Sequence, residues 1–118
     1  MKLRANIVQQ HMKKDRNANG FSLDLHMQQI PSIDNIRNFL TPDEIVNLDL
    51  SFNYFKEIEP IFNIFNNLQW LDLSANSIQS IENLHGLTGL QYLNLSTNNI
   101  IKVIGLEFPE SLRVLVIF

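Results

Sequence analysis

Three aspartates recur at nearly regular intervals and are the residues best placed to do chemistry. Asp24, Asp49 and Asp72 are separated by 25 and 23 residues, and each stands between two leucines. Paired carboxylates can act as acid and base in the hydrolysis of sugars, and clustered carboxylates can hold a hard cation such as Ca²⁺. Which chemistry is available depends on whether the fold gathers the three side chains in a cleft or spreads them along an open surface.

Other residue types that catalysis or metal binding would need are missing or badly spaced. The three histidines, His11, His26 and His85, lack the spacing of metal ligands. Cysteine is absent, so there is no cysteine nucleophile, and the sequence contains no glycine-rich phosphate loop. The sequence therefore predicts no catalytic residue, no metal site and no cofactor.

A repeated pattern of leucines surrounds the aspartates. Three copies follow L-x-x-L-x-L-x-x-N, with isoleucine opening the first, over residues 45–53, 68–76 and 90–98; a degenerate copy lies at 23–28. After each copy, apolar residues follow at every third position, which favours 3-10 turns over a full α-helix. Each copy is thus predicted to form one strand and one return segment, and the pattern continues to the last residue.

This pattern resembles the leucine-rich-repeat proteins, specifically the subfamily with copies of about 22 residues. The resemblance covers roughly residues 20–118 and implies an α/β leucine-rich-repeat solenoid. A curved parallel sheet would form the concave side, 3-10 or short helical turns the convex side, and a helix the N-terminal cap. The first copy is longer by residues 37–44, which are expected to bulge on the convex side and leave the sheet register intact.

Two regions are predicted from charge and pattern. Residues 1–20 hold five basic residues against one acidic residue and are expected to form a basic capping helix or arm. Residues 21–118, with four basic and eleven acidic residues, form the repeat domain: four repeats, a partial fifth, and an open C-terminal edge. Within the arm, helical spacing relates the apolar residues Leu3, Ile7, Val8 and Met12, with Asn19 and Gly20 as terminator.

Strand alternation predicts which side chains leave the core. The leucines point inward, so the residues beside and between them line the concave face in three columns. The columns are Ser22, Asn47, Trp70, Tyr92 and Val114; Asp24, Asp49, Asp72, Asn94 and Val116; and His26, Ser51, Ser74, Ser96 and Phe118. Trp70 and Tyr92 should adjoin as an aromatic platform beside an acidic stripe.

An open sheet suits neither chemistry considered for the aspartates. It offers no sugar cleft and no device that would separate two carboxyl pKa values, and a column does not converge six to eight oxygens on one ion. The sequence therefore predicts a non-enzymatic protein–protein interaction module. Its predicted contact residues are Asn47, Asp49, Trp70, Asp72, Tyr92 and Asn94. The alternative is that polar residues only solvate the sheet.

Secondary contacts are predicted outside these columns. Phe52 and Tyr54 flank Asn53 and, with Phe62, suggest an outer apolar patch. The basic residues Lys13, Lys14 and Arg16 could meet an acidic partner, whereas nucleic acid is disfavoured because few cations and no interleaved aromatics are present. Asn53, Asn76 and Asn98, with Gln28 in the degenerate copy, are expected to satisfy backbone groups at the turns.

The fifth copy stops inside its strand at Phe118. Its apolar edge, which includes Val116 and Phe118, is expected to face outward and to be covered by another chain or by a missing extension. The isolated chain is accordingly expected to self-associate. Without cysteine, a signal-peptide-like apolar run or a membrane-length apolar segment, the expected location is cytoplasmic.

Three short segments, residues 13–17, 29–36 and 107–112, are similar to segments of small axonemal members of the subfamily, such as the leucine-rich-repeat light chain of outer-arm dynein. That resemblance implies a structural adaptor in a large ciliary assembly, with microtubule-associated or dynein-related partners. Other members of the subfamily imply two alternatives: a regulatory module of protein phosphatase 1, or an adaptor of a spliceosomal ribonucleoprotein.

Overall fold

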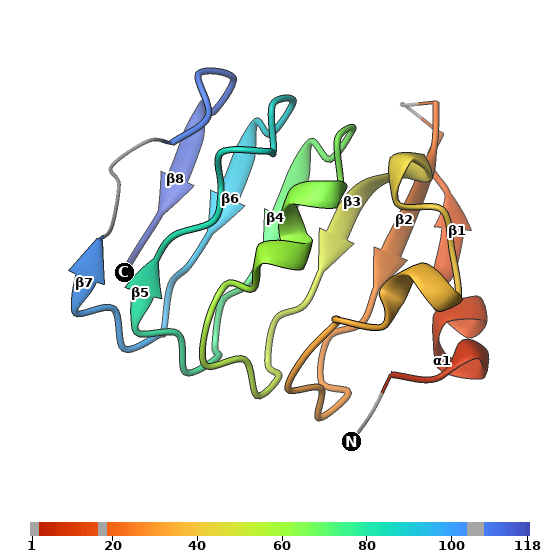
Figure 1. The fold of residues 1–118 in the computed structure, drawn as a ribbon, viewed down its shortest axis with the longest axis horizontal. Helices are drawn as coiled ribbons and strands as arrows, with labels where there is room; N and C mark the ends of the chain where they lie inside the picture. The colour runs from red at the N-terminus through yellow and green to blue at the C-terminus, as the bar shows by residue number, and fades with distance from the viewer. Residues whose placement is uncertain (1–2, 17–18, 104–107) are drawn as a thin grey trace.

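The computed structural model describes residues 3–16, 19–103 and 108–118 (Figure 1). Predictions that involve Lys2, Asn17, Leu106 or Glu107 lie outside the described residues. With η marking a 3-10 helix, the elements are α1 (Ala5–Gln10), β1 (Met12–Lys14), β2 (Phe21–Asp24), η1 (Ile36–Asn38), η2 (Pro42–Glu44), β3 (Ile45–Asp49), η3 (Pro60–Ile64), β4 (Trp70–Asp72), β5 (Ser80–Ile81), β6 (Tyr92–Asn94), β7 (Lys102–Val103) and β8 (Val114–Val116).

Most strands belong to one sheet, to which each repeat contributes a strand. The order is β1-β2-β3-β4-β6-β8, and β5 and β7 form a separate pair. Neighbours in the larger sheet are parallel except β1, which is antiparallel to β2. Leu71 lies opposite Leu48 on one side and Leu93 on the other. The leucine pattern therefore predicts this part of the topology and its register correctly.

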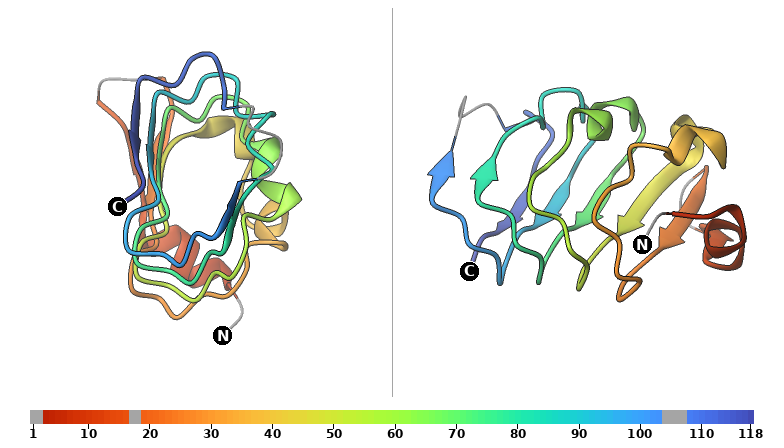
Figure 2. Two further views of the ribbon diagram at one scale, coloured as in Figure 1. Left: turned by 90° about the vertical axis from the view of Figure 1, so that its left-hand side faces the viewer. Right: turned by 60° about the horizontal axis from the view of Figure 1, so that its bottom comes forward.

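The apolar core fills the space between the sheet and the return segments, which form a second layer (Figure 2). Leu48, Leu71 and Leu93 are each at most 1% exposed, because alternate residues of a strand point to the same side. Burial of one such side chain stabilises by about 1.5–3 kcal/mol. A slip of one residue would expose the leucines and bury the aspartates, so the core fixes the register.

The return segments differ from one repeat to the next. The 3-10 helices η1 and η3 confirm the predicted 3-10 turns in the first two repeats. Pro60 starts η3 with a fixed φ suited to the first helical turn. The later repeats lack a proline there, and their return segments contain β5 and β7, a parallel pair that the sequence analysis did not predict.

The extra residues of the first repeat leave the sheet almost undisturbed. They contain η2, which leads directly into β3. Phe21 pairs with Ile45 and Ser22 with Asn47, so Val46 forms a bulge at the start of β3. From Ser22 onward the register is regular, as predicted, and the bulge is the local exception.

The N-terminal segment departs from the predicted helix. Helix α1 ends at Gln10, and Met12, which was expected on that helix, lies in strand β1 opposite Leu23. Gly20 does not end a helix: it is buried, and a Cβ there would lie 2.6 Å from the carbonyl oxygen of Glu44. Over the described ranges, no helix has the length and apolar character that crossing a bilayer requires.

Buried asparagine side chains connect successive turns. The Oδ1 atom of Asn53 accepts hydrogen bonds from the backbone N–H groups of Gln28 and Ile30, both at 3.0 Å. Its Nδ2 group donates to three backbone carbonyl oxygens at 2.9–3.1 Å. Asn76 and the partly buried Asn98 likewise each donate to three carbonyl oxygens and accept from a backbone N–H of the preceding turn. The predicted structural role of these residues is confirmed.

Candidate functional site

The face of the six-stranded sheet that points away from the core, here called the sheet face, carries the predicted columns. Trp70 pairs with Asn47 and Tyr92, and Asp72 pairs with Asp49 and Asn94. The columns continue to Ser22 and Asp24 on β2 and to Val114 and Val116 on β8. The structure thus brings the predicted contact residues together on one surface; that they bind a partner stays a prediction.

Trp70 and Tyr92 form the predicted aromatic platform. Their ring centroids are 5.2 Å apart and their planes differ by 6°, so the rings are stacked. Both side chains are half-buried. Such a pair contributes about 0.5–1.5 kcal/mol beyond its area burial and restricts the rotamers of both residues. The platform is therefore rigid before any partner arrives.

A shallow hollow lies beside Trp70. Its volume is about 360 Å³, and it is lined by Ser22, Leu23, Asp24, Asn47, Asp49 and Trp70. Tyr92 stacks on Trp70 from β6, which lies on the opposite side of β4 from the hollow. Because the two ring planes are nearly parallel, the ring face that Tyr92 leaves uncovered is turned toward β3 and the hollow.

The acidic column is held by local hydrogen bonds. The Oδ1 atom of Asp49 accepts from the backbone N–H of Ser51 at 2.9 Å and from its hydroxyl at 2.7 Å. Corresponding turns are closed by Asp24, Asp72 and Asn94, whose Oδ1 atoms accept from the N–H two residues on at 2.8–3.1 Å. Such side-chain turns fix each carboxylate direction. These aspartates therefore also have a structural role.

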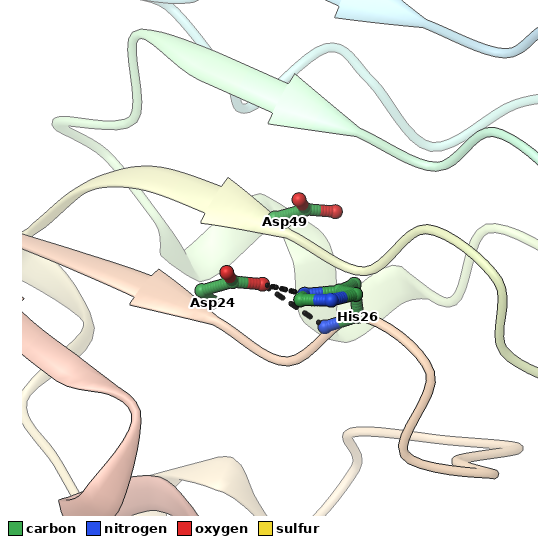
Figure 3. Close-up of side chains that lie close together, drawn as sticks. All are labelled: Asp24, His26 and Asp49. Carbon is green, nitrogen blue, oxygen red and sulfur yellow. Dashed lines mark hydrogen bonds and ion pairs between the residues drawn. The ribbon is translucent and has the colours of Figure 1, made fainter.

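The structure also groups residues that the sequence analysis kept apart. Nδ1 of His26 lies 2.6 Å from Oδ1 of Asp24, and Asp49 approaches the pair from β3 (Figure 3). One possible ligand atom from each of the three residues lies within 4.8 Å of the others. The strand register could have predicted this group, because His26 follows Asp24 by two residues and Asp24 pairs with Asp49. Three such ligands could hold a divalent ion such as Zn²⁺ only with added water.

The histidine–aspartate pair shifts both pKa values. The hydrogen bond to Asp24, reinforced by the Asp24 charge, raises the pKa of His26 above its usual 6.5. Partial burial raises the pKa of Asp24, but the hydrogen bonds from His26 outweigh it and leave that pKa below its usual 3.8. Stability from His26 is present below the usual histidine pKa and is lost as pH rises through the raised value. Stability from Asp24 is lost as pH falls through its lowered value.

Replacing Asp24 with asparagine is therefore expected to lower the pKa of His26 toward 6.5. Proton NMR of the His26 imidazole signals across a pH series measures the change in pKa. The same loss of charge in Glu57→Gln, at an exposed residue with no hydrogen bond to His26, serves as the control. An unchanged His26 titration in Asp24→Asn would contradict the pairing.

The third predicted column is only partly exposed. Ser51 and Ser74 are buried, at 6% and 9% exposure, so they do not line the sheet face as predicted. The backbone turns there, and the carbonyl oxygens of both residues accept backbone N–H groups of Met27 and Phe52 in neighbouring repeats. His26 and Phe118, at the ends of the column, are exposed.

Lys13 and Lys14 belong to strand β1 of the same sheet and not to a separate helix. Lys13 pairs with Ser22 across β1 and β2, so its side chain shares the sheet face. Lys14 pairs with Phe21 and points to the other side. Arg16 follows β1 and is exposed. The basic arm and the acidic columns are thus neighbouring parts of one sheet.

Apolar side chains gather at the turns that follow β2 and β3. Met27, Phe52 and Tyr54 are 67%, 59% and 57% exposed. Phe62 was predicted to join them, but this prediction is wrong. Phe62 is fully buried and contacts Phe55 edge-to-face, with ring centroids 6.0 Å apart. Phe52 and Tyr54 are thus exposed, as the predicted outer patch requires, whereas Phe62 is not part of it; a contact with a partner at Phe52 and Tyr54 stays a prediction.

Comparison with protein families agrees with this repeated architecture. Residues 43–100 match a family model described as leucine rich repeat, and residues 89–115 match a second model with the same description. Together the two matches run from η2 to β8. Comparison with curated proteins and with solved structures gave no significant match. Leucine-rich repeats generally mediate protein–protein interaction and are typically non-enzymatic. The chain belongs to the leucine-rich-repeat proteins, with an α/β fold in which each repeat adds a strand to a mostly parallel sheet.

Proposed function

We propose that this chain is a non-enzymatic adaptor module that binds a partner protein through the sheet face. The observation that supports this most directly is the Trp70–Tyr92 stack, which lies beside the fixed carboxylates of Asp49 and Asp72. Tryptophan and tyrosine are the residues that most often dominate protein interfaces, and flanking charges select the partner. A pre-stacked pair loses little rotamer freedom on binding, which favours affinity.

We further propose that the repeats stack as a solenoid whose concave side is the sheet face, and that α1 with β1 caps its first turn. Leu3 and Val8 support the cap, because they are 3% and 0% exposed and pack on the common core. The antiparallel pairing of β1 with β2 supports it as well, because it occupies the hydrogen-bonding edge of β2.

The narrower predictions concern the assembly in which the module works. An axonemal adaptor in the cytoplasm or cilium, with microtubule-associated or dynein-related partners, rests on the resemblance of residues 13–17, 29–36 and 107–112. The predicted alternatives are a phosphatase 1 regulatory module and a ribonucleoprotein adaptor. These remain predictions, and the partner bound by the sheet face separates them: tubulin-associated proteins, a phosphatase subunit or splicing proteins.

Loss of the aromatic platform is expected to weaken partner binding strongly without unfolding the chain. Affinity capture from native lysate compares the wild type with Trp70→Ala/Tyr92→Ala, and binding of a purified captured protein is then measured. Truncation of central interface aromatics typically costs at least 2 kcal/mol, or about a 30-fold loss of affinity.

A matched control carries two substitutions away from the sheet face, His85→Ala and Thr88→Ala, both at exposed residues between β5 and β6. Circular dichroism must show that the variants are folded. Equal capture by the wild type and the aromatic variant would contradict a sheet-face interface. It would indicate that binding uses Phe52, Tyr54 or the basic arm.

A further inference from the structure

We propose that the hollow beside Trp70 receives the guanidinium group of an arginine carried by a segment of the partner protein. This inference rests on the proposed function and adds the chemistry of the partner. The hollow, at about 360 Å³, lies at the small end of the range for ligand pockets and suits one long side chain more than a folded element.

The walls of the hollow offer the two surfaces that a guanidinium group needs. One is the ring face of Trp70 that Tyr92 leaves uncovered, which can stack on a planar cation. The other is the pair of carboxylates on Asp24 and Asp49, which can accept its N–H groups. An aliphatic arginine stem can lie along the exposed edge of Trp70 while the head group reaches the acids.

Of the two carboxylates that line the hollow, Asp24 is paired with His26, whereas Asp49 is held in position by its turn. Asp49 and Asp72 use Oδ1 in their turns, and among the described residues Oδ2 of each has no hydrogen-bond partner. An ion pair joins His26 to Asp24. The charge of Asp49, which lines the hollow, is therefore available to a guest without reorganisation of its side chain, and Asp72 adds negative charge on the neighbouring strand.

Fixed cations on the same face do not fill the hollow. Lys13 lies on β1 opposite Ser22, at the edge of the hollow, but it does not line the hollow, and strands β2 and β3 separate it from Trp70. His26 follows β2 and is hydrogen-bonded to Asp24, and it does not line the hollow. From residue 21 onward the sequence holds eleven acidic and four basic residues, so a basic partner segment is also favoured at longer range.

The test uses the full chain and the fluorescence of Trp70, its single tryptophan. The probe is acetyl-Gly-Arg-Gly-Arg-Gly-amide, compared with the same peptide carrying citrulline or lysine in place of arginine. Citrulline keeps the length and planar shape of arginine, but a carbonyl oxygen replaces one guanidinium nitrogen and the side chain has no charge. The arginine peptide is expected to change the emission saturably, the citrulline peptide to have no effect, and the lysine peptide to bind more weakly.

Asp49→Asn is expected to weaken binding of the arginine peptide about tenfold, the typical effect of losing one charge-assisted hydrogen bond. The variant should fold, because Asn94 closes the equivalent turn on β6 with its own Oδ1 at 2.9 Å from the N–H of Ser96. Glu57→Gln makes the same charge change at an exposed residue outside the hollow and is expected to leave binding unchanged.

The inference would be overturned if the arginine peptide did not change the Trp70 emission, or if the citrulline or lysine peptide changed it equally. A change in emission with ZnCl₂ but not with the arginine peptide would also overturn it. The lysate experiment separates this failure from failure of the proposed function. Partner capture that depends on Trp70 and Tyr92 but not on Asp49 leaves the adaptor function in place and removes only the arginine assignment. If the arginine peptide does not bind and partner capture does not depend on Trp70 and Tyr92, both the arginine proposal and the proposed function fail.

Discussion

Replacement of Phe62 with alanine is expected to lower the free energy of unfolding by about 3–5 kcal/mol, the usual cost of removing a fully buried phenylalanine. Phe62 is 0% exposed, and its ring packs edge-to-face on Phe55 at 6.0 Å between centroids. The truncation removes that contact and leaves a cavity in the layer opposite the sheet. Urea denaturation followed by circular dichroism measures the change, with the slope m checked for constancy.

Phe52→Ala is the matched control, because it removes the same atoms from a side chain that is 59% exposed. Phe52 has a positive φ of 56°, but Ala75 holds the same conformation, at 54°, in the next repeat, so alanine is tolerated there. The control is expected to change stability by no more than about 0.5 kcal/mol. Equal losses in the two variants would contradict the placement of Phe62 in the core.

The position of Phe62 also shows where a repeat pattern stops being predictive. Alignment of the copies places Phe62 at a position where Arg37 and His85 occur in other repeats, which suggested an exposed side chain. In the structure, Pro60 starts η3, and a 3-10 helix places residues three apart on one side. Phe62 and Phe65 therefore both face the core, and the local helix overrides the repeat register.

The strands, in contrast, could be predicted residue by residue. Leucine alternation determines which side of each strand is buried, and the position of the leucine pattern in each copy determines which residues are neighbours. For that reason the pairing of Asn47, Trp70 and Tyr92 follows from the sequence alone. The strand spacing of about 4.8 Å predicts that the two rings adjoin, and the structure shows that they are stacked.

Features that depend on contacts outside this alternation could not be predicted. Strand β1 carries Lys13 onto the sheet face because its backbone pairs with β2, and the apolar spacing of the segment had favoured a longer helix. The contact between His26 and Asp24 depends on the turn conformation after β2, which places the imidazole back over the carboxylate. The sequence predicted the position of the acidic column. It did not predict that these aspartates close turns, because that role depends on the backbone geometry after each strand.

Asn76→Ala is expected to be the most damaging polar substitution, with a loss of about 2–4 kcal/mol in the free energy of unfolding. The Asn76 side chain donates to three carbonyl oxygens and accepts from the N–H of Phe55. A buried backbone group left without a partner costs about 1–3 kcal/mol. A water molecule that occupies the space left by the side chain recovers part of that cost. Thermal and urea unfolding measure the loss.

Asn99→Ala provides the control, because that side chain is exposed and forms no hydrogen bond within the described residues. It is expected to change stability by no more than about 0.5 kcal/mol. If Asn76→Ala were as stable as this control, the asparagine hydrogen bonds would contribute nothing net. Under conditions where Asn76→Ala is fully folded, its Trp70 fluorescence and its response to the arginine peptide should match those of the wild type. Asn76 holds the turns together on the inside, whereas Trp70 and Asp49 act on the opposite, outward side of the same strands.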